Sequence, residues 1–415
     1  MASPASEDVP TTTARAPQQA ENPRSRRSEG PIASVGRRVR PDAKRYLWML
    51  GILAPASALL PSQLVMQTGL SIFWWTGPMI FFILIPVVDG LVGEDGNNPP
   101  DEAIETLQND HYYRWLTYLF IPVQYISLWV VCWLWTYGTL SPIDKLGQAI
   151  SLGLVAGISI NAAHEIGHRS DTLEGWLAKI ALAQTFYGHF YVEHNRGHHV
   201  RVATPEDPAS ARMGETIYRF FPRTVAGSMR SGWILETRRL ALAGRKWWSP
   251  RNHILQAWMF SLLIFAGLIA FFGWGILPLI LIQAVVGIML LEAVNYVEHY
   301  GLLRKRDDKG RYESIRPAHS WNSDRLVTNI FLYHLQRHSD HHAYPGRRYQ
   351  TLRSWKEAPQ LPYGYATMVV AALFPPLWRR VMDHRLLDHV DGRIEDLNLA
   401  PHKRRRLIAR YGVDR

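Results

Sequence analysis

Three long stretches almost without charged residues constrain the fold of this chain more than any other feature. The stretches are residues 46–88, 115–163 (where Asp144 and Lys145 are the exceptions) and 254–291. A helix needs roughly 20 apolar residues to cross a bilayer, and each stretch is about twice that length. Each stretch also has a polar, proline or glycine break near its middle, at residues 61–63, 141–145 and 273–275. The sequence therefore predicts an all-α integral membrane protein with six transmembrane helices in three hairpins, rather than very long buried helices in a soluble protein.

The distribution of charge predicts the orientation of these helices. The chain has 46 Lys and Arg against 35 Asp and Glu, a net charge of +11, and the three breaks carry almost none of it. Because positive residues favour the cytoplasmic side, we expect both termini and the connections between hairpins to be cytoplasmic. Such a basic face suits membrane lipid headgroups or an acidic protein partner. No motif for nucleic-acid binding is present, and the membrane topology accounts for the excess charge.

Composition divides the chain into three parts. Residues 1–40 are rich in Pro, Ser, Ala and Arg, which predicts a disordered cytoplasmic tail. Residues 41–383 form the predicted six-helix membrane domain with its cytoplasmic segments, and residues 384–415 form a basic C-terminal cytoplasmic tail. The single cysteine, Cys132, rules out a disulfide or an iron–sulfur cluster built from this chain alone. Electrons for any redox chemistry must therefore come from elsewhere.

Nine of the 17 histidines fall in four clusters, each at or just beyond a predicted cytoplasmic end of a membrane helix. They are His164, His168, His194, His198, His199, His299, His338, His341 and His342. The i, i+4 spacing of the first pair places both side chains on one helical face. Neutral imidazole binds Zn, Cu, Fe and Ni, and nine ligands are too many for one ion. We therefore expect a site for two metal ions in a histidine-rich cap on the cytoplasmic side.

Acidic and amide side chains accompany these clusters. Adjacent helical residues point about 100° apart, so an acid next to a histidine does not share its direction. We expect these side chains to orient the free ring N–H of another histidine instead. The predicted orienting residues are Glu165, Glu193, Asn295, Glu298 and Asp340.

The first cluster also matches a different enzyme. His164-Glu165-Ile166-Gly167-His168 has the H-E-x-x-H pattern of zinc metalloproteases, so an intramembrane zinc protease is an alternative. A catalytic zinc takes three protein ligands, which leaves most of the clustered histidines unused. A metal transporter is a further alternative, but its ligands would lie within the spans rather than at one end.

Taken together, the motifs resemble a known family. HEIGH (164–168), EHNRGHHVRVATPEDPASAR (193–212), NYVEHYGL (295–302) and LQRHSDHHAYP (335–345) are similar to motifs of the integral-membrane di-iron desaturases and hydroxylases. Within that superfamily the chain resembles the bacterial membrane-bound alkane 1-monooxygenases, the AlkB-type alkane hydroxylases. The likeness extends from about Lys44 to Asp383 and includes GEDGNNPP (93–100) and SWNS (320–323). One departure is Tyr344, where many members have a histidine.

The resemblance implies a cofactor and a reaction. It implies two non-haem iron ions held by the nine histidines, with O2 as co-substrate. It implies insertion of one oxygen atom into the terminal C–H bond of a medium- or long-chain n-alkane taken from the bilayer, giving a 1-alcohol. It also implies electrons from a rubredoxin, which an NAD(P)H-dependent reductase reduces. A xylene-type methyl hydroxylase and an acyl-lipid hydroxylase or desaturase are the alternatives within the superfamily.

Two further groups of residues have predicted roles. Bulky aromatic residues of the first hairpin are candidates to line a substrate tunnel and set the chain length, namely Trp74, Trp75, Phe81 and Phe82. Three arginines that flank the histidine motifs are candidates to dock an acidic electron donor, namely Arg196, Arg201 and Arg337.

Overall fold

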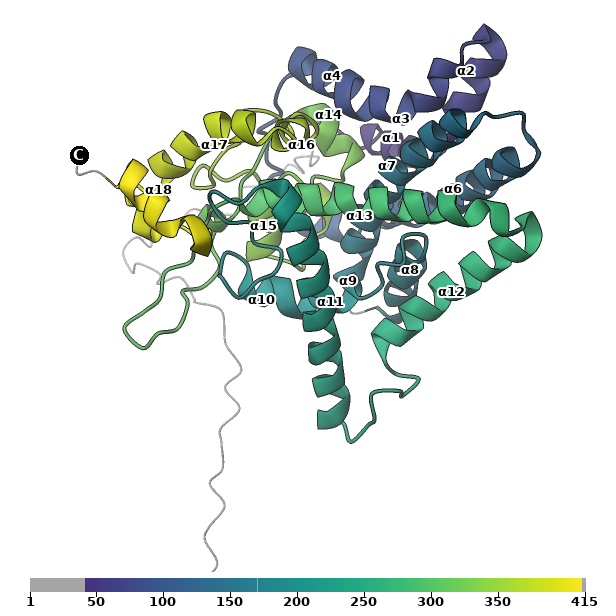
Figure 1. The fold of residues 1–415 in the computed structure, drawn as a ribbon. Coiled ribbons are helices and arrows are strands. Elements are labelled where there is room, and N and C mark those ends of the chain that lie inside the picture. Colours follow the sequence, from purple (N-terminus) through teal and green to yellow (C-terminus); the bar gives the residue numbers. More distant parts are fainter. Residues whose placement is uncertain (1–41, 170, 413–415) are drawn as a thin grey trace, which may run out of the picture. The chain divides into compact units, whose positions relative to one another are not determined.

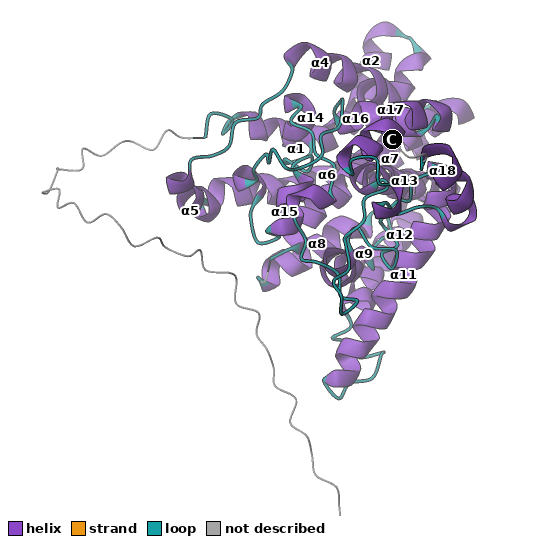
Figure 2. Cartoon of the chain, turned by 90° about the vertical axis from the view of Figure 1, so that its left-hand side faces the viewer, coloured by secondary structure: helices purple, strands orange, loops and turns teal. Residues whose placement is uncertain are grey.

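A computed structural model describes residues 42–169 and 171–412; the predicted tail of residues 1–40 lies outside this range. Within the described residues the fold is helical, without any named β-strand (Figures 1 and 2). Six helices are long and apolar enough to cross a membrane, which confirms the predicted all-α fold with six spans, while their arrangement in three hairpins stays a prediction. These spans are Leu47–Thr68, Ser71–Val92, His111–Tyr137, Pro142–Gly167, His253–Phe272 and Trp274–His299.

The spans contain eight α-helices. These are α1 (Leu50–Ala56), α2 (Leu60–Thr68), α3 (Thr76–Met79), α4 (Ile85–Val92), α6 (His111–Tyr137), α7 (Pro142–Gly167), α12 (His253–Phe272) and α13 (Leu277–His299). The helices outside the spans are α5 (Asp101–Asn109), α8 (Thr172–Ala183), α9 (Phe190–Glu193), α10 (His199–Arg201), α11 (Ile217–Leu242), α14 (Leu326–Phe331), α15 (His338–Ala343), α16 (Tyr365–Ala372), α17 (Pro375–His389) and α18 (Arg404–Tyr411).

The ends of the long helices follow from local capping. The side chain of Ser141 accepts from the backbone N–H of Asp144 in a capping box at the start of α7. The side chain of Asn252 caps the start of α12 by accepting from the backbone N–H groups of Ile254 and Leu255. Gly273 ends α12 with φ +83°, a conformation that only glycine adopts without strain.

The first break lies at a different place from the one predicted. Residues 61–63 belong to α2. Pro61 does not interrupt this helix, because it lies in the first turn, where its missing N–H costs no hydrogen bond. The first span instead ends at Gly69, which has φ +71°. The other two predicted breaks, at 141–145 and 273–275, agree with the starts of α7 and of the last span.

Helix α7 is the central element of the bundle. In its apolar window 89% of the residues are buried, against 22 to 44% in the other five spans. It packs along α13, and Figure 1 shows the two helices side by side with α11 crossing α13. A Cβ atom at Gly153 would lie 2.6 Å from the Cβ of Val286, so the glycine permits this close approach. The approach matters because α7 and α13 both end at histidine motifs.

The C-terminal residues pack on the end of this bundle that carries the histidine motifs. The predicted boundary between residues 383 and 384 falls inside α17. Beyond it, Leu386, Leu397 and Leu407 are buried in the same apolar cluster as Tyr296 and Tyr300 of the α13 end. The basic run at residues 402–406 begins α18 and stays largely exposed.

Candidate metal centre

The nine clustered histidines come together from four separate parts of the chain. The C-terminal ends of α7 and α13 supply three of them, and the segment from α9 to α10 supplies another three. The short helix α15 supplies the last three. His168 is partly exposed and the other eight are at most 9% exposed. The structure sorts the nine into one group of five and one group of four. The sequence predicted that they converge but not this division.

The group of five contains His164, His168, His194, His199 and His341. Their potential ligand atoms all lie within 4.8 Å of one another. The Nε2 atom of His341 lies 2.9 Å from that of His164 and 3.1 Å from that of His199. The Nε2 atom of His194 lies 3.1 Å from that of His168 and 3.0 Å from that of His199. Five imidazole nitrogens therefore point to one small volume.

The group of four contains His198, His299, His338 and His342, again within 4.8 Å of one another. The Nε2 atom of His338 lies 3.1 Å from that of His299 and 2.9 Å from that of His342. The two groups adjoin, because the ring centroids of His199 and His342 are 4.4 Å apart. Two metal ions held by these groups would be close neighbours.

A π-helical turn explains how the middle motif serves both groups. Residues His194–His198 form this wider turn between α9 and α10. In an ordinary α-helix, residues four apart share a face, which would pair His194 with His198. The π-turn instead brings residues five apart together, so His194 and His199 join the first group and His198 turns to the second. Single π-turns of this kind occur frequently at functional sites.

Burial keeps these imidazoles in the form that binds metals. It lowers the pKa of His338, His341 and His342 well below the ordinary histidine value, and the neighbouring histidines lower it further. At neutral pH the rings are therefore uncharged, with a free lone pair for coordination. The Nε2 atom of His198 is buried and has no hydrogen-bond partner among the described residues, as expected of an atom that faces a metal.

A carboxylate that the sequence reasoning missed orients His198. Nδ1 of His198 lies 2.9 Å from Oδ2 of Asp207, and the hydroxyl of Ser210 donates to the same oxygen at 2.6 Å. Burial raises the pKa of Asp207, but the charge and hydrogen bond of His198, the hydrogen bond of Ser210 and the charge of His299 together outweigh this, and the pKa falls to about 2. Carboxylate–histidine–metal arrangements fix the ring orientation in this way. The nine-residue gap between the two side chains gave no helical signal.

Of the five predicted orienting residues, Glu298 reaches a clustered imidazole. Its Oε2 atom lies 3.2 Å from Nε2 of His338, the nitrogen that faces the other members of the group of four. The second oxygen, Oε1, is buried and has no hydrogen-bond partner among the described residues. Glu298 therefore stands where a further ligand to the second ion would stand, which is a different role from the one predicted.

The other four predictions of an orienting role are wrong, because these side chains bond elsewhere. Glu165 pairs with Arg169 at 2.6 Å, and Glu193 pairs with Arg201 at 2.7 Å. The amide of Asn295 donates to Glu292 at 3.2 Å. Asp340 accepts from Arg347, from the indole of Trp355 and from the backbone of Arg353, which holds the segment after α15 in place.

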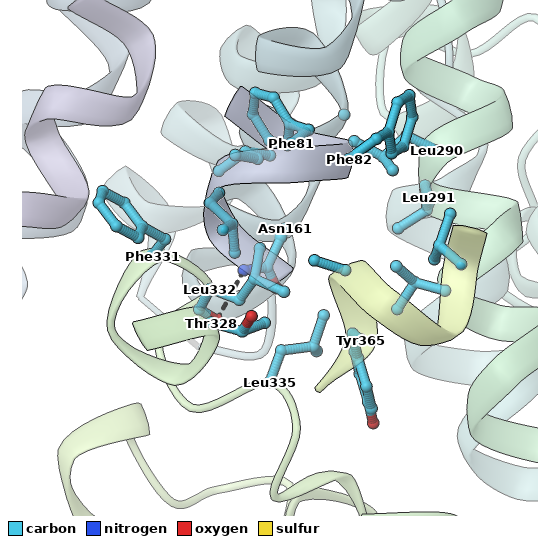
Figure 3. Close-up of a pocket in the computed structure, with 16 residues that line it drawn as sticks. Phe81, Phe82, Asn161, Leu290, Leu291, Thr328, Phe331, Leu332, Leu335 and Tyr365 are labelled. Carbon is cyan, nitrogen blue, oxygen red and sulfur yellow. Dashed lines mark hydrogen bonds between the residues drawn. The ribbon is translucent and has the colours of Figure 1, made fainter. Parts of the chain in front are cut away.

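An apolar cavity lies among residues of the second span, α7, α13, α14 and α16 (Figure 3). Figure 3 shows Phe81 and Phe82 on one side of it and Leu335 and Tyr365 on the other. It also receives residues of α7 and α13, such as Asn161 and Leu290. Phe81 and Phe82 thus lie where the predicted tunnel residues should lie. Trp74 and Trp75 instead pack near the start of α7, where Trp75 covers Gly147, and they do not line this cavity.

Three neighbouring cavities between the apolar flank and the first histidine group share lining residues. The outermost lies between the first two spans and is lined by Leu53, Leu60 and Leu84, all of them exposed on the apolar flank. It shares Phe81 and Phe331 with the cavity of Figure 3. That cavity in turn shares Asn161 and Leu335 with a small one lined by His164 and His341.

The three predicted docking arginines differ in exposure. The side chain of Arg196 is 39% exposed and pairs with Glu236, and that of Arg201 is 31% exposed and pairs with Glu193. Arg337 is fully buried and donates to the backbone oxygens of Leu352, Asp95 and Asn97. The prediction for Arg337 is therefore wrong, because it ties three loops together and offers no charge to a partner.

Fold and site together define a class of protein, the helical membrane metalloproteins with paired histidine groups at one end of the bundle. The family model of the fatty acid desaturases matches residues 145–372, more than half of the chain. Accordingly, the chain belongs to the fatty acid desaturase family and, within it, to the alkane 1-monooxygenases.

Curated relatives support the second of these assignments. The chain is 46% identical to the alkane 1-monooxygenase of Acinetobacter baylyi, over 90% of this chain and 92% of that protein. It is 43% identical to alkane 1-monooxygenase 1 of Alcanivorax borkumensis, with the same coverage. The hydroxylase component of xylene/toluene monooxygenase from Pseudomonas putida is 30% identical over 57% of this chain and 63% of that protein.

Proposed function

We propose that this protein is a membrane di-iron monooxygenase that hydroxylates the terminal carbon of medium- or long-chain n-alkanes. The reaction consumes an alkane, O2, two electrons and two protons, and it yields a 1-alcohol and water. The observation that carries the proposal is the pairing of groups of five and four imidazoles beside a series of neighbouring cavities that begins at the apolar flank. The names of the curated relatives support the same reaction.

The donor set fits two iron ions. Nine neutral imidazoles supply nitrogen ligands, which iron accepts, and the division into five and four leaves room for O2 or for Glu298 at the second ion. Iron bound there would supply the activation of O2. The chain itself holds the ligands in place, through Asp207 on His198 and through the loop that Arg337 ties down behind α15.

The cavity favours a hydrocarbon over an acyl lipid. Three polar side chains line it, and each has its donor group occupied: Asn161 bonds to Leu332 O, Thr328 to Asp89, and Tyr365 to Trp321 O. The cavity therefore presents a carbon surface, without a cation for a headgroup or a carboxylate. An alkane dissolves in the bilayer and gains nothing from polar contacts, so this lining suits it.

The two electrons must come from a partner. The single cysteine, Cys132, is buried in a membrane span and offers no redox group. We propose a rubredoxin as the donor, itself reduced by an NAD(P)H-dependent reductase. It would dock on the cytoplasmic side, where Arg196 and Arg201 flank the histidine segment. In the same proposal the protein resides in the bacterial inner membrane with both termini in the cytoplasm, as the charge distribution favours.

One experiment tests the proposal. The purified protein in detergent is assayed for metal content and for conversion of dodecane with rubredoxin, its reductase and NADH, with products separated by gas chromatography. We expect about two irons per chain, as a two-metal site requires, and 1-dodecanol as product. One zinc per chain without O2 consumption would overturn the proposal in favour of the H-E-x-x-H protease.

A methyl hydroxylase of the xylene type is the second candidate, because one relative is the hydroxylase component of such an enzyme. The same assay with m-xylene separates the two. Faster turnover of m-xylene than of any n-alkane would favour this candidate and exclude an alkane as the main substrate.

A further inference from the structure

Beside the first histidine group, a chain of oxidisable aromatic side chains leads away from the site. Its inner member is Tyr333, which lines the same small cavity as His164 and His341. Tyr333 is held in the left-handed region, at φ +52°, which is a strained conformation for a tyrosine. Such strain persists where surrounding structure imposes it, frequently at functional sites. The hydroxyl end of its ring packs against Gly51 of α1, while the residue itself lines the small cavity beside His164 and His341.

The next rings follow at short intervals. The ring centroids of Tyr333 and Tyr349 are 5.1 Å apart, and those of Tyr349 and Trp48 are 5.0 Å apart. A branch runs from Tyr349 to Tyr113 at 5.9 Å and on to the half-buried Tyr112 at 5.2 Å. The four inner rings are at most 2% exposed. Phenol and indole are the most easily oxidised aromatic side chains, and electrons transfer readily over such distances.

The hydrogen bonds along the chain give it a direction. Loss of an electron from phenol or indole is much easier when the proton leaves to a nearby base. The hydroxyl of Tyr333 is buried and has no partner among the described residues, so a radical at this ring has no base to take its proton. Asp42, in contrast, accepts from Nε1 of Trp48 at 2.8 Å and from the hydroxyl of Tyr113 at 3.0 Å.

Neighbouring cations favour Trp48 over the tyrosine branch. The guanidinium of Arg45 lies 4.2 Å from the ring centroid of Tyr112 and 5.3 Å from that of Tyr113, where it opposes positive charge on either ring. Lys44 lies farther from Trp48, at 5.8 Å, and its ammonium is paired with Asp95. An oxidising equivalent that leaves the site therefore localises on the indole of Trp48.

We propose that this chain is a protective redox relay, which carries an oxidising equivalent out of the site when O2 reacts there without an alkane. The inference rests on the proposed O2-dependent function. Trp48 loses one electron, which passes through Tyr349 and Tyr333 to reduce the oxidised site, and the Nε1 proton of Trp48 moves to Asp42. A soluble one-electron reductant, such as a thiol, then returns the electron by way of Tyr112 and Tyr113, and Asp42 returns the proton.

The relay spares the ligands from oxidation. Without it, an oxidised site that finds no substrate attacks the nearest side chains, which are the histidines themselves.

The test uses the iron-loaded, full-length protein in detergent. It is reduced, mixed with O2 in the absence of alkane, frozen within milliseconds and examined by electron paramagnetic resonance. We expect an organic radical whose spectrum narrows when the protein contains ring-deuterated tryptophan. Trp48→Phe should abolish this signal. Tyr349→Phe, which removes a single hydroxyl and preserves packing, should reduce its yield, and Asp42→Asn should do the same by removing the base.

Tyr300→Phe is the matched control. Tyr300 is also fully buried, directly follows His299 and donates to the carboxylate of Asp383 at 3.0 Å. It does not belong to the series of aromatic rings that forms the relay. Its replacement should leave the radical unchanged. Peptide mass spectrometry after O2 consumption without alkane gives a second readout. Oxidation should be found at Trp48 in the parent protein and at the ligand histidines in Trp48→Phe.

The outcomes separate the relay from the proposed function. A preparation that hydroxylates alkanes but yields no organic radical, or a radical that survives Trp48→Phe, overturns the relay and leaves the proposed function standing. A radical lost in Tyr300→Phe would also overturn it. A preparation that consumes no O2 overturns both.

Discussion

Asp207 fixes the orientation of His198 through a buried hydrogen bond of 2.9 Å between Oδ2 and Nδ1. This bond sets the Nε2 atom of the ring toward the group of four and away from His194, its neighbour one turn earlier. The backbone N–H of Ala209 and the hydroxyl of Ser210 both donate to the same carboxylate, so the carboxylate is itself held in position. The second metal position thus depends on a side chain that is not a ligand.

Replacing Asp207 should weaken metal binding in the second group. We expect Asp207→Asn to lower iron affinity or activity by about 10- to 100-fold, as loss of such orienting partners does in other metal sites. Iron content after dialysis against a mild chelator measures the affinity. Glu206→Gln is the control, because this neighbouring acid is exposed and pairs with Arg306 at the surface. An equal loss in both variants would show that the effect is one of folding.

The position of Phe81 predicts control of substrate length. Its side chain stands where the outermost cavity meets the cavity of Figure 3. Removing the ring in Phe81→Ala should join the two spaces and allow longer alkanes to reach the site. The measurement is the product profile from an equimolar mixture of n-alkanes. Phe271→Ala, at an exposed position on α12, should leave the profile as it is. An unchanged profile in Phe81→Ala would contradict this role.

The sequence predicted the membrane fold and the nine histidines because both depend on short-range patterns. Apolar length determines a span, and i, i+4 spacing determines a helical face, as at His164 and His168. The division into five and four was beyond such reasoning, because the π-turn at His194–His198 departs from the 3.6-residue period. No pattern of residue types marks that departure.

Interactions between distant parts of the chain account for the remaining errors. Glu165 is adjacent to His164 in sequence, yet its carboxylate meets Arg169, because a side chain on the next position points to another side of the helix. Arg337 carries a charge and was therefore expected at the surface. Its guanidinium instead finds three backbone acceptors in the interior, and their positions depend on the tertiary fold.

Glu298 and Glu165 should respond differently to the same substitution. Glu298→Gln keeps the size of the side chain but puts an amide in place of the carboxyl group whose Oε2 atom lies 3.2 Å from Nε2 of His338. We expect its iron content to fall from about two towards about one per chain, because a ligand-side carboxylate is lost. Glu165→Gln should retain both irons and lose thermal stability instead, since it breaks the ion pair with Arg169. Metal analysis and melting temperature, measured on the same samples, distinguish the two. Equal iron contents would place Glu298 outside the metal site.

Arg196 should contribute to the docking of the electron donor rather than to catalysis. Its side chain is partly exposed, and its partner Glu236 stays paired with Arg239 when Arg196 is removed. Arg196→Gln therefore leaves no buried charge unpaired. We expect KM for rubredoxin to rise about two- to fivefold with kcat unchanged, which corresponds to the free energy of one exposed ion pair. The dependence of kcat/KM on salt should become weaker, because a charge near the surface speeds the encounter of the two proteins.

Arg311→Gln, in an exposed loop where Arg311 pairs with Asp307, is the control and should change neither constant. A fall in kcat with KM unchanged would assign Arg196 to the arrangement of the histidine segment and would remove it from the docking surface.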